Sequence, residues 1–319
     1  VTVIGIMAMP AMLRSRYDPA LAAGAVTAGG TLGILIPPCV MLLLYGPVAG
    51  VSVIKLFAAA FFPGLLLSFL YIAYVLVRSF LKPAVGPALP PQERVTSLTH
   101  GLRELALGIV PAATLMAAAL GSILAGLATP TEAASMGALG ALVLGFAYRR
   151  LDFKKLRDAA TLTLQTSSMI LLLAVAANVY GAIFTRLGTA TWITQGLLGL
   201  DFPPLLMMVF IMGWIFLLGW PLEWPAIILI FVPLFLPVVE ALGFDPIWFG
   251  ALVAVNLQTA FLSPPVAMAA YYLKAVAPEV EFTDIYKGMM QFMVLQVVGL
   301  LIVLFFPQIA LWLPAVLFD

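Results

Sequence analysis

Two proline pairs, each inside a long apolar run, are the positions in this sequence best suited to bind an ion or a small anion. Pro37-Pro38 and Pro264-Pro265 lack the amide hydrogens that a continuous helix needs, so we expect the helix to break at both. The preceding residues are small or carry a hydroxyl group: Gly29, Gly30, Thr31 and Gly33 before the first pair, Thr259 and Ser263 before the second. Freed carbonyl and hydroxyl oxygens suit hard cations, and helix amino ends favour anions.

The runs that contain these pairs are long enough to cross a bilayer. The chain is 64% hydrophobic and 9% charged, and its mean hydropathy is +1.15. A soluble domain of this size would expose too much apolar surface with such a composition. Because the apolar residues form long runs rather than short alternating segments, we predict an all-α polytopic membrane protein and not a β-barrel.

The apolar runs predict where the helices lie. They cover residues 20–45, 53–77, 105–127, 131–148, 158–184, 204–218, 225–239, 246–272 and 289–313. The runs 204–218 and 225–239 are short for independent spans and are joined at Gly219 to Glu223, so we predict a re-entrant hairpin over 204–239. Thr129 or Thr131 is a candidate helix N-cap, with Glu132 in the first turn.

The positive charges, with the exception of Arg186, give one consistent topology. The rule that cytoplasmic loops are rich in Lys and Arg places the following residues in the cytoplasm: Arg14, Arg16, Arg78, Lys82, the cluster from Arg149 to Arg157, Lys274 and Lys287. The two broken helices then run in opposite directions, as in an inverted repeat whose breaks meet near the midplane. We assign residues 1–82 to the end of the first repeat, with a hairpin arm, a broken helix and a span. A polar loop follows over 83–104, and the second repeat spans 105–319, with scaffold helices, the hairpin, a broken helix over 246–273 and a last span.

Each candidate also has a simpler interpretation. One proline in a membrane helix is often only a kink, and Gly219 could merely allow close helix packing. Asn256 and Gln258 could be interhelical hydrogen-bonding residues or ligands, and Glu223 could be an intramembrane ionisable group or a helix cap. Paired breaks at inverted positions favour a binding site over isolated kinks.

Several classes of function are excluded by residue types. Cys39 and His100 are the single cysteine and the single histidine, so the chain can form neither an internal disulfide nor a Cys/His metal site. A net charge of +1 offers no basic face for nucleic acid. The apolar runs contain no HExxH motif, no Ser/His pair and no Asp pair, so we predict that the protein is not an enzyme and has no organic cofactor.

Three motifs resemble those of one transporter family. They are AAGAVTAGGTLGILIPPCVMLLLYG at 22–46, GLATPTEAASMGALGAL at 126–142, and the stretch from LEWPAIILIFVPLFLPVVEALGFDPIWFG at 222–250 to VNLQTAFLSPPVAMAAYYLKAVAP at 255–278. They are similar to the large membrane subunit (DctM-like, M subunit) of TRAP (tripartite ATP-independent periplasmic) transporters, over essentially the whole chain. Because the sequence begins at Val1, without Met, we expect an N-terminally truncated subunit, with the partner hairpin's tip upstream and residues 1–13 as its returning arm.

The resemblance implies an elevator-type, sodium-coupled importer in the bacterial inner membrane. It would import a carboxylate delivered by a periplasmic binding protein and would need a small four-helix membrane subunit. Sodium is the only metal implied. The first sodium site would use Gly30, Thr31, Gly33, Ile36 and Pro38, and the second Gly219, Thr259, Leu262, Ser263 and Pro264. The candidate substrate-binding residues are Thr31, Asn256, Gln258 and Glu223.

This sequence departs from the family pattern at three positions. Cys39 replaces the commoner Ser after the first proline pair, and Ser263 and Ala267 replace Thr and Gly around the second. Ser263 keeps a hydroxyl, so we expect the second sodium site to be retained. The alternative function is a stand-alone ion-coupled anion symporter that needs no binding protein, which neighbouring genes for the partners would argue against.

Overall fold

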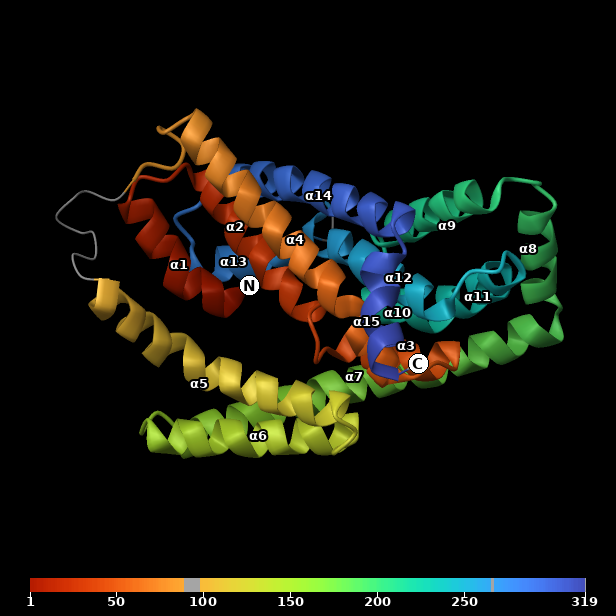
Figure 1. Ribbon diagram of the computed structural model, residues 1–319, viewed down its shortest axis with the longest axis horizontal. Coiled ribbons are helices and arrows are strands. Elements are labelled where there is room, and N and C mark those ends of the chain that lie inside the picture. Colours follow the sequence, from red (N-terminus) through yellow and green to blue (C-terminus); the bar gives the residue numbers. More distant parts are fainter. Residues whose placement is uncertain (89–97, 265–266, 319) are drawn as a thin grey trace. The chain divides into compact units, whose positions relative to one another are not determined.

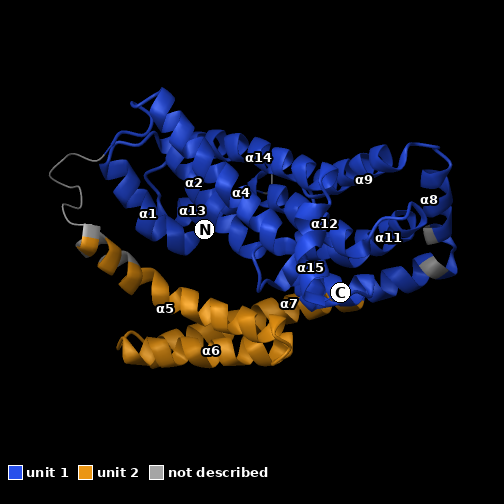
Figure 2. Ribbon diagram, in the orientation of Figure 1, with its two compact units in different colours: residues 1–88, 176–319 blue, residues 89–175 orange. Residues whose placement is uncertain are grey.

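The computed structural model describes residues 1–88, 98–264 and 267–318, and within these ranges the chain is helical with no β-strand (Figure 1). Five of the described helices are long and apolar enough to cross a membrane. The all-α polytopic class predicted from composition is therefore confirmed. The chain divides into two compact units, residues 1–88 with 176–319 and residues 89–175 (Figure 2).

The N-terminal part of the first unit contains the first broken helix. Its elements are α1 (Thr2–Arg14), α2 (Pro19–Thr31), the 3₁₀ turn η1 (Leu32–Ile34), α3 (Val40–Ala49) and α4 (Val53–Leu81). Asp18 caps α2 by accepting a hydrogen bond from the amide of Leu21 at 2.9 Å, and Pro19 follows at the first helical position. Gly50 ends α3 with a φ of 66°, a conformation that glycine adopts without steric cost.

The C-terminal part of the same unit repeats the pattern. It contains α8 (Thr189–Leu198), α9 (Pro204–Leu218), α10 (Trp224–Ala226), η2 (Ile227–Phe231), α11 (Val232–Ala241), α12 (Pro246–Leu262), α13 (Met268–Val276), α14 (Phe282–Phe305) and α15 (Gln308–Phe318). The three elements α10, η2 and α11 form one uninterrupted helix, with a π-helical turn in its middle. Both predicted hairpin arms are thus present as helices, α9 and 224–241.

The second unit is built from α5 (Leu98–Leu124), α6 (Pro130–Ala147) and the first part of α7 (Phe153–Arg186). Thr129 caps α6 as predicted. Its hydroxyl accepts from the amide of Glu132 at 3.3 Å, and the Glu132 carboxylate accepts from the Thr129 amide at 2.8 Å. This reciprocal capping box satisfies amide donors that the helix itself leaves free.

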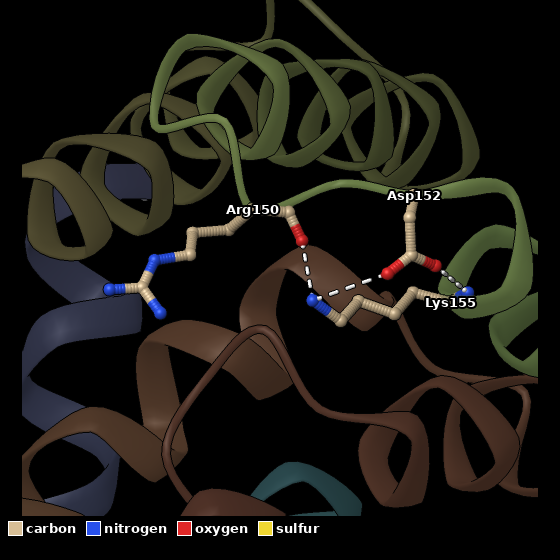
Figure 3. A network of polar contacts seen from close by, with 3 residues as sticks. All are labelled: Arg150, Asp152 and Lys155. Carbon is tan, nitrogen blue, oxygen red and sulfur yellow. Dashed lines mark hydrogen bonds and ion pairs between the residues drawn. The ribbon is translucent and has the colours of Figure 1, made fainter.

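The turn from α6 to α7 carries part of the predicted basic cluster. Lys155 Nζ donates to the carbonyl oxygen of Arg150 at 2.7 Å and lies 3.6 Å from the Asp152 carboxylate (Figure 3). Asp152 in turn accepts from the amide of Lys155 at 2.7 Å and so caps α7. This hydrogen bond from the backbone lowers the pKa of Asp152 below its usual range.

Three expected boundaries were wrong. The last span does not start at residue 289: α14 begins at Phe282, and Lys287 lies within it on an exposed face, 3.7 Å from Asp284. The predicted span 289–313 is also divided into two helices. Pro307 disfavours the helical conformation of the residue before it, so α14 ends at Phe305. In the predicted loop 83–104, residues 98–104 already belong to α5, since charged residues are compatible with an extended helix end. Residues 89–97 of that loop lie outside the described residues.

Candidate functional site

Both proline pairs interrupt a helix, as predicted. The first break covers residues 35–39, between η1 and α3. The second covers residues 263–267, between α12 and α13, and its residues 265 and 266 lie outside the described part of the chain. Because residues in a break have no regular helical hydrogen bonds, backbone carbonyls become available there.

The two broken helices pack against each other in opposite directions. The half that leads into the first break, α2, contacts α13, the half that leaves the second, and α3 contacts α12. The contact of α14 with α2 likewise has a counterpart in the contact of α4 with α12. This reciprocal pattern is what two antiparallel copies of one motif make when their breaks lie at a similar depth.

Residues of the first predicted sodium site lie around α2 and its end. Thr31 is buried, and its hydroxyl donates to the carbonyl oxygen of Ala28 at 2.8 Å, so it is already used within the helix. A methyl group on Gly30 would meet the backbone of Val1 at 2.6 Å, so the residue that precedes α1 packs directly on this glycine. Ile36 packs on Gly64 of α4, whereas Gly33 and Pro38 are exposed.

Residues of the second predicted sodium site are closely packed. Gly219, at the end of the first hairpin arm, is buried against α12: a methyl group there would meet the Cβ atom of Ala260 at 3.0 Å. The Thr259 hydroxyl donates to the Asn256 carbonyl oxygen at 2.6 Å. The Ser263 hydroxyl is buried and has no hydrogen-bond partner among the described residues. A buried hydroxyl without a partner is an oxygen available to a bound ion.

Leu262 and Pro264 complete the second predicted site. Leu262 is buried and ends α12, while Pro264 is exposed. They have no donor atoms in their side chains, so any contribution would come from their backbone carbonyls.

The candidate substrate-binding residues are not gathered on one face. Asn256 and Gln258 are both buried, but two residues along a helix correspond to a rotation of about 200°, so their side chains point in different directions. Asn256 Nδ2 donates to the carbonyl oxygen of Met212 in α9 at 2.7 Å, and Gln258 Nε2 donates to that of Ala254 at 3.4 Å. Each amide keeps a buried oxygen without a partner among the described residues. Glu223 is exposed just before α10 and makes no capping hydrogen bond.

The structure also reveals buried polar groups that the sequence argument missed. Tyr71 of α4 and Gln296 of α14 are buried, and the Tyr71 hydroxyl and both amide atoms of Gln296 have no hydrogen-bond partner among the described residues. Their only signal in the sequence is a polar residue inside a long apolar run.

Comparisons with known proteins place these features in a family. The model of the DctM component of the tripartite ATP-independent periplasmic transporters matches residues 1–309. The C4-dicarboxylate TRAP transporter large permease protein DctM of Pseudomonas aeruginosa is 34% identical over 98% of this chain and 72% of its own length. The sialic acid TRAP transporter large permease protein SiaM of Vibrio cholerae is 30% identical over 98% of this chain and 71% of its own.

A third relative is a longer protein. The isethionate TRAP transporter permease protein DctMQ of Oleidesulfovibrio alaskensis is 30% identical, and this chain spans 48% of its length. The match again extends over 98% of this chain. The chain therefore belongs to the DctM family of tripartite ATP-independent periplasmic transporter permeases, and it is a multi-pass inner-membrane transport protein, not an enzyme.

Proposed function

We propose that this chain is the large permease subunit of a sodium-coupled secondary transporter that imports a carboxylate by an elevator mechanism. The observation that carries the proposal is the antiparallel packing of the two broken helices, with α2 on α13 and α3 on α12. Breaks paired in this way bring backbone carbonyls and helix ends together, which is how many secondary transporters bind ions and substrate.

Sodium is the coupling ion that the donor set favours. The second break offers backbone carbonyls and the unpartnered hydroxyl of Ser263, and Gly219 of the hairpin lies against the same helix end. Neutral oxygens of this kind suit a hard cation, whereas a softer transition metal would favour sulfur or imidazole ligands. Among the described residues, no group of three His, Cys, Asp or Glu side chains could hold a multivalent metal. We assign the first sodium site to Gly30, Thr31, Gly33, Ile36 and Pro38, where the oxygens would be backbone carbonyls of the first break and the Thr31 hydroxyl, which donates to Ala28 but keeps lone pairs for a cation.

The substrate is a small organic anion. Residues 31–40 and 256–268 contain no Lys or Arg, so an anion bound between the breaks would be met by the amino ends of α3 and α13 and by side-chain amides and hydroxyls. The relatives are named for C4-dicarboxylates, sialic acid and isethionate, which are all organic anions. A carboxylate is the class common to the first two, and we propose it here.

The proposed partners follow from the family. They are a periplasmic binding protein, which delivers the anion, and a small four-helix membrane subunit. The name DctMQ of one relative, which is about twice the length of this chain, is consistent with a permease of two joined parts.

Uptake into liposomes tests the proposal. The full-length subunit would be reconstituted with its small partner, and uptake of a labelled carboxylate panel measured with the sodium gradient and the binding protein each present or omitted. Uptake that needs both supports the tripartite function and identifies the substrate. Uptake that needs sodium but not the binding protein would instead support a stand-alone symporter, and absence of carboxylate uptake under every condition would refute the carboxylate proposal.

A further inference from the structure

A cavity lies among α2, α4 and α14. None of its described lining residues belongs to the second break. These three helices contact one another and lie side by side in Figure 1. The cavity has a volume of about 330 Å³. Its wall is almost wholly apolar and includes Ala25, Leu32, Tyr71, Ile72, Val75, Leu76 and Phe292. The Ser68 hydroxyl, which also lies in the wall, already donates to the carbonyl oxygen of Gly64 at 2.9 Å.

The cavity opens on the outer face of α4. Ile72 and Leu76 are 60% and 64% exposed, and both lie in a helix that is long and apolar enough to span a membrane. Where such a helix face meets a bilayer, the neighbouring groups are lipid acyl chains. The size of the cavity and its apolar wall suit such a chain.

Positive charges gather where the same three helices begin or end. The amide of Asp18, before α2, donates to the carbonyl oxygen of Val85 at 2.9 Å, which holds the turn after α4 beside the turn after α1. Gly288, in the second turn of α14, packs against the backbone of Ala20 and Gly24. The basic residues at these ends are Arg14, Arg16, Arg78, Lys82 and Lys287, and they outnumber the acidic residues there, Asp18, Glu281 and Asp284, of which Asp284 lies 3.7 Å from Lys287.

Arg78 connects this basic end to the cavity. One of its terminal guanidinium nitrogens donates to the Tyr74 hydroxyl at 3.0 Å, and its Cζ atom lies 5.6 Å from the centre of the Tyr74 ring. The centre of the Tyr74 ring lies 5.3 Å from the centre of the Phe292 ring, and Phe292 lines the cavity. The Nε atom of Arg78 is buried without a hydrogen-bond partner, and no carboxylate among the described residues pairs with this side chain. A guanidinium with unused donors thus lies one aromatic ring away from the cavity wall.

We propose that this groove binds an anionic phospholipid. One acyl chain occupies the cavity between α2, α4 and α14, and the phosphate binds Arg78, with Lys82 at the same end. Arginine pairs well with phosphate, and basic pockets between membrane helices recognise anionic head groups. This site does not depend on the proposed sodium or carboxylate chemistry.

Native mass spectrometry of the full-length subunit with its small partner tests the site. The complex would be exposed to phosphatidylglycerol or phosphatidylethanolamine with the same acyl chains. The wild type should retain phosphatidylglycerol preferentially, and Arg78→Gln should reduce that retention about fivefold, as expected for one cation near a lipid surface. Arg78→Lys should preserve most of it. Arg150→Gln, in the exposed turn before α7, is the matched control and should change nothing.

A second pair of variants tests the acyl chain. Val75→Trp should fill the cavity and reduce retention of either lipid, whereas Val77→Trp, at an exposed position outside the lining, should not. Equal retention of the two lipids by the wild type would overturn the proposal. So would phosphatidylglycerol retention that is unchanged in Arg78→Gln, or the absence of any retained lipid, which would indicate that another protein segment covers the groove.

Discussion

Asn256 of α12 donates through Nδ2 to the backbone carbonyl oxygen of Met212 in α9, at 2.7 Å and away from solvent. This hydrogen bond joins the first hairpin arm to the helix that ends in the second break. Seven residues beyond Met212 the same arm reaches Gly219, which packs on Ala260 one turn after Asn256. The bond therefore fixes the register between the hairpin tip and the break.

Replacing Asn256 by Ala should destabilise the protein. The variant leaves the Met212 carbonyl without its side-chain donor, and interhelical hydrogen bonds in membrane proteins contribute about 0.6 to 2 kcal/mol. Thermal unfolding of the purified subunit in detergent would measure the loss as a lower Tm. Gln195→Ala, at an exposed position in α8, is the control. An unchanged Tm for both variants would show that the bond contributes nothing.

At the contact between Gly24 and Gly288, we expect a substitution to cost more stability than Asn256→Ala does. A methyl group on Gly24 would lie 2.7 Å from the backbone carbonyl group of Gly288 and 2.7 Å from the Phe292 ring, so α2 and α14 would have to separate. Gly24→Leu should cost several kcal/mol, about 3 or more by comparison with overpacked cores, and should abolish the monodisperse peak in size-exclusion chromatography. Gly213→Leu, which faces open space, should leave that peak intact.

Asp152 predicts a pH dependence at the start of α7. Its pKa is lowered by the hydrogen bond from the Lys155 amide, so the capping contribution is fully present above the unfolded pKa of about 3.9 and is lost as the pH falls through the lower folded pKa. Amide hydrogen exchange over 153–157, corrected for intrinsic rates, should show reduced protection once the pH falls below the folded-state pKa of Asp152. Asp152→Asn, which caps without titrating, should remove the pH dependence. Equal pH dependence in wild type and variant would contradict the assignment.

The architecture was readable from the sequence because its signals are local. Pro37-Pro38 and Pro264-Pro265 each remove two consecutive amide donors, which strongly disfavours a regular helix, and Thr129 with Glu132 forms its capping box within a single turn. The start of α14 lies seven residues before the predicted position 289, because a lysine on an exposed face, such as Lys287, is compatible with a helix interior. The π-helical turn at Ile227–Phe231 has no sequence signal in a run of ordinary apolar residues.

The candidate site could be predicted only in part because its contacts are tertiary. Gly219 indicated a close approach, but nothing in the sequence named Ala260 as the neighbour. Asn256 and Gln258 were equivalent candidates in the sequence, and only the packing of α9 gives Asn256 an interhelical partner. Whether these residues and Ser263 bind sodium or substrate stays a prediction.

Ala267 should be a position where glycine improves stability. Its φ is 29°, a positive value that glycine adopts without steric cost, and the family motif carries glycine at this position. Ala267→Gly should raise the Tm by an amount corresponding to about 1 kcal/mol. Ala269→Gly, inside α13, should lower it by a similar amount because glycine weakens a helix interior. A lower Tm for Ala267→Gly would show that the alanine is not strained.

Ser263 and Gly219 test the second sodium site. Ser263→Ala removes a buried hydroxyl that has no other partner in the described structure, so the sodium concentration for half-maximal uptake should rise about tenfold, while Ser263→Thr should stay near wild type. Gly219→Val should slow uptake at all sodium concentrations, because its side chain would press on Ala260 at the hairpin tip. Ser135→Ala, exposed in α6, is the control for Ser263→Ala. If Ser263→Ala folds normally and keeps the wild-type sodium dependence, Ser263 does not bind the coupling ion, and the second site must rest on backbone carbonyls alone.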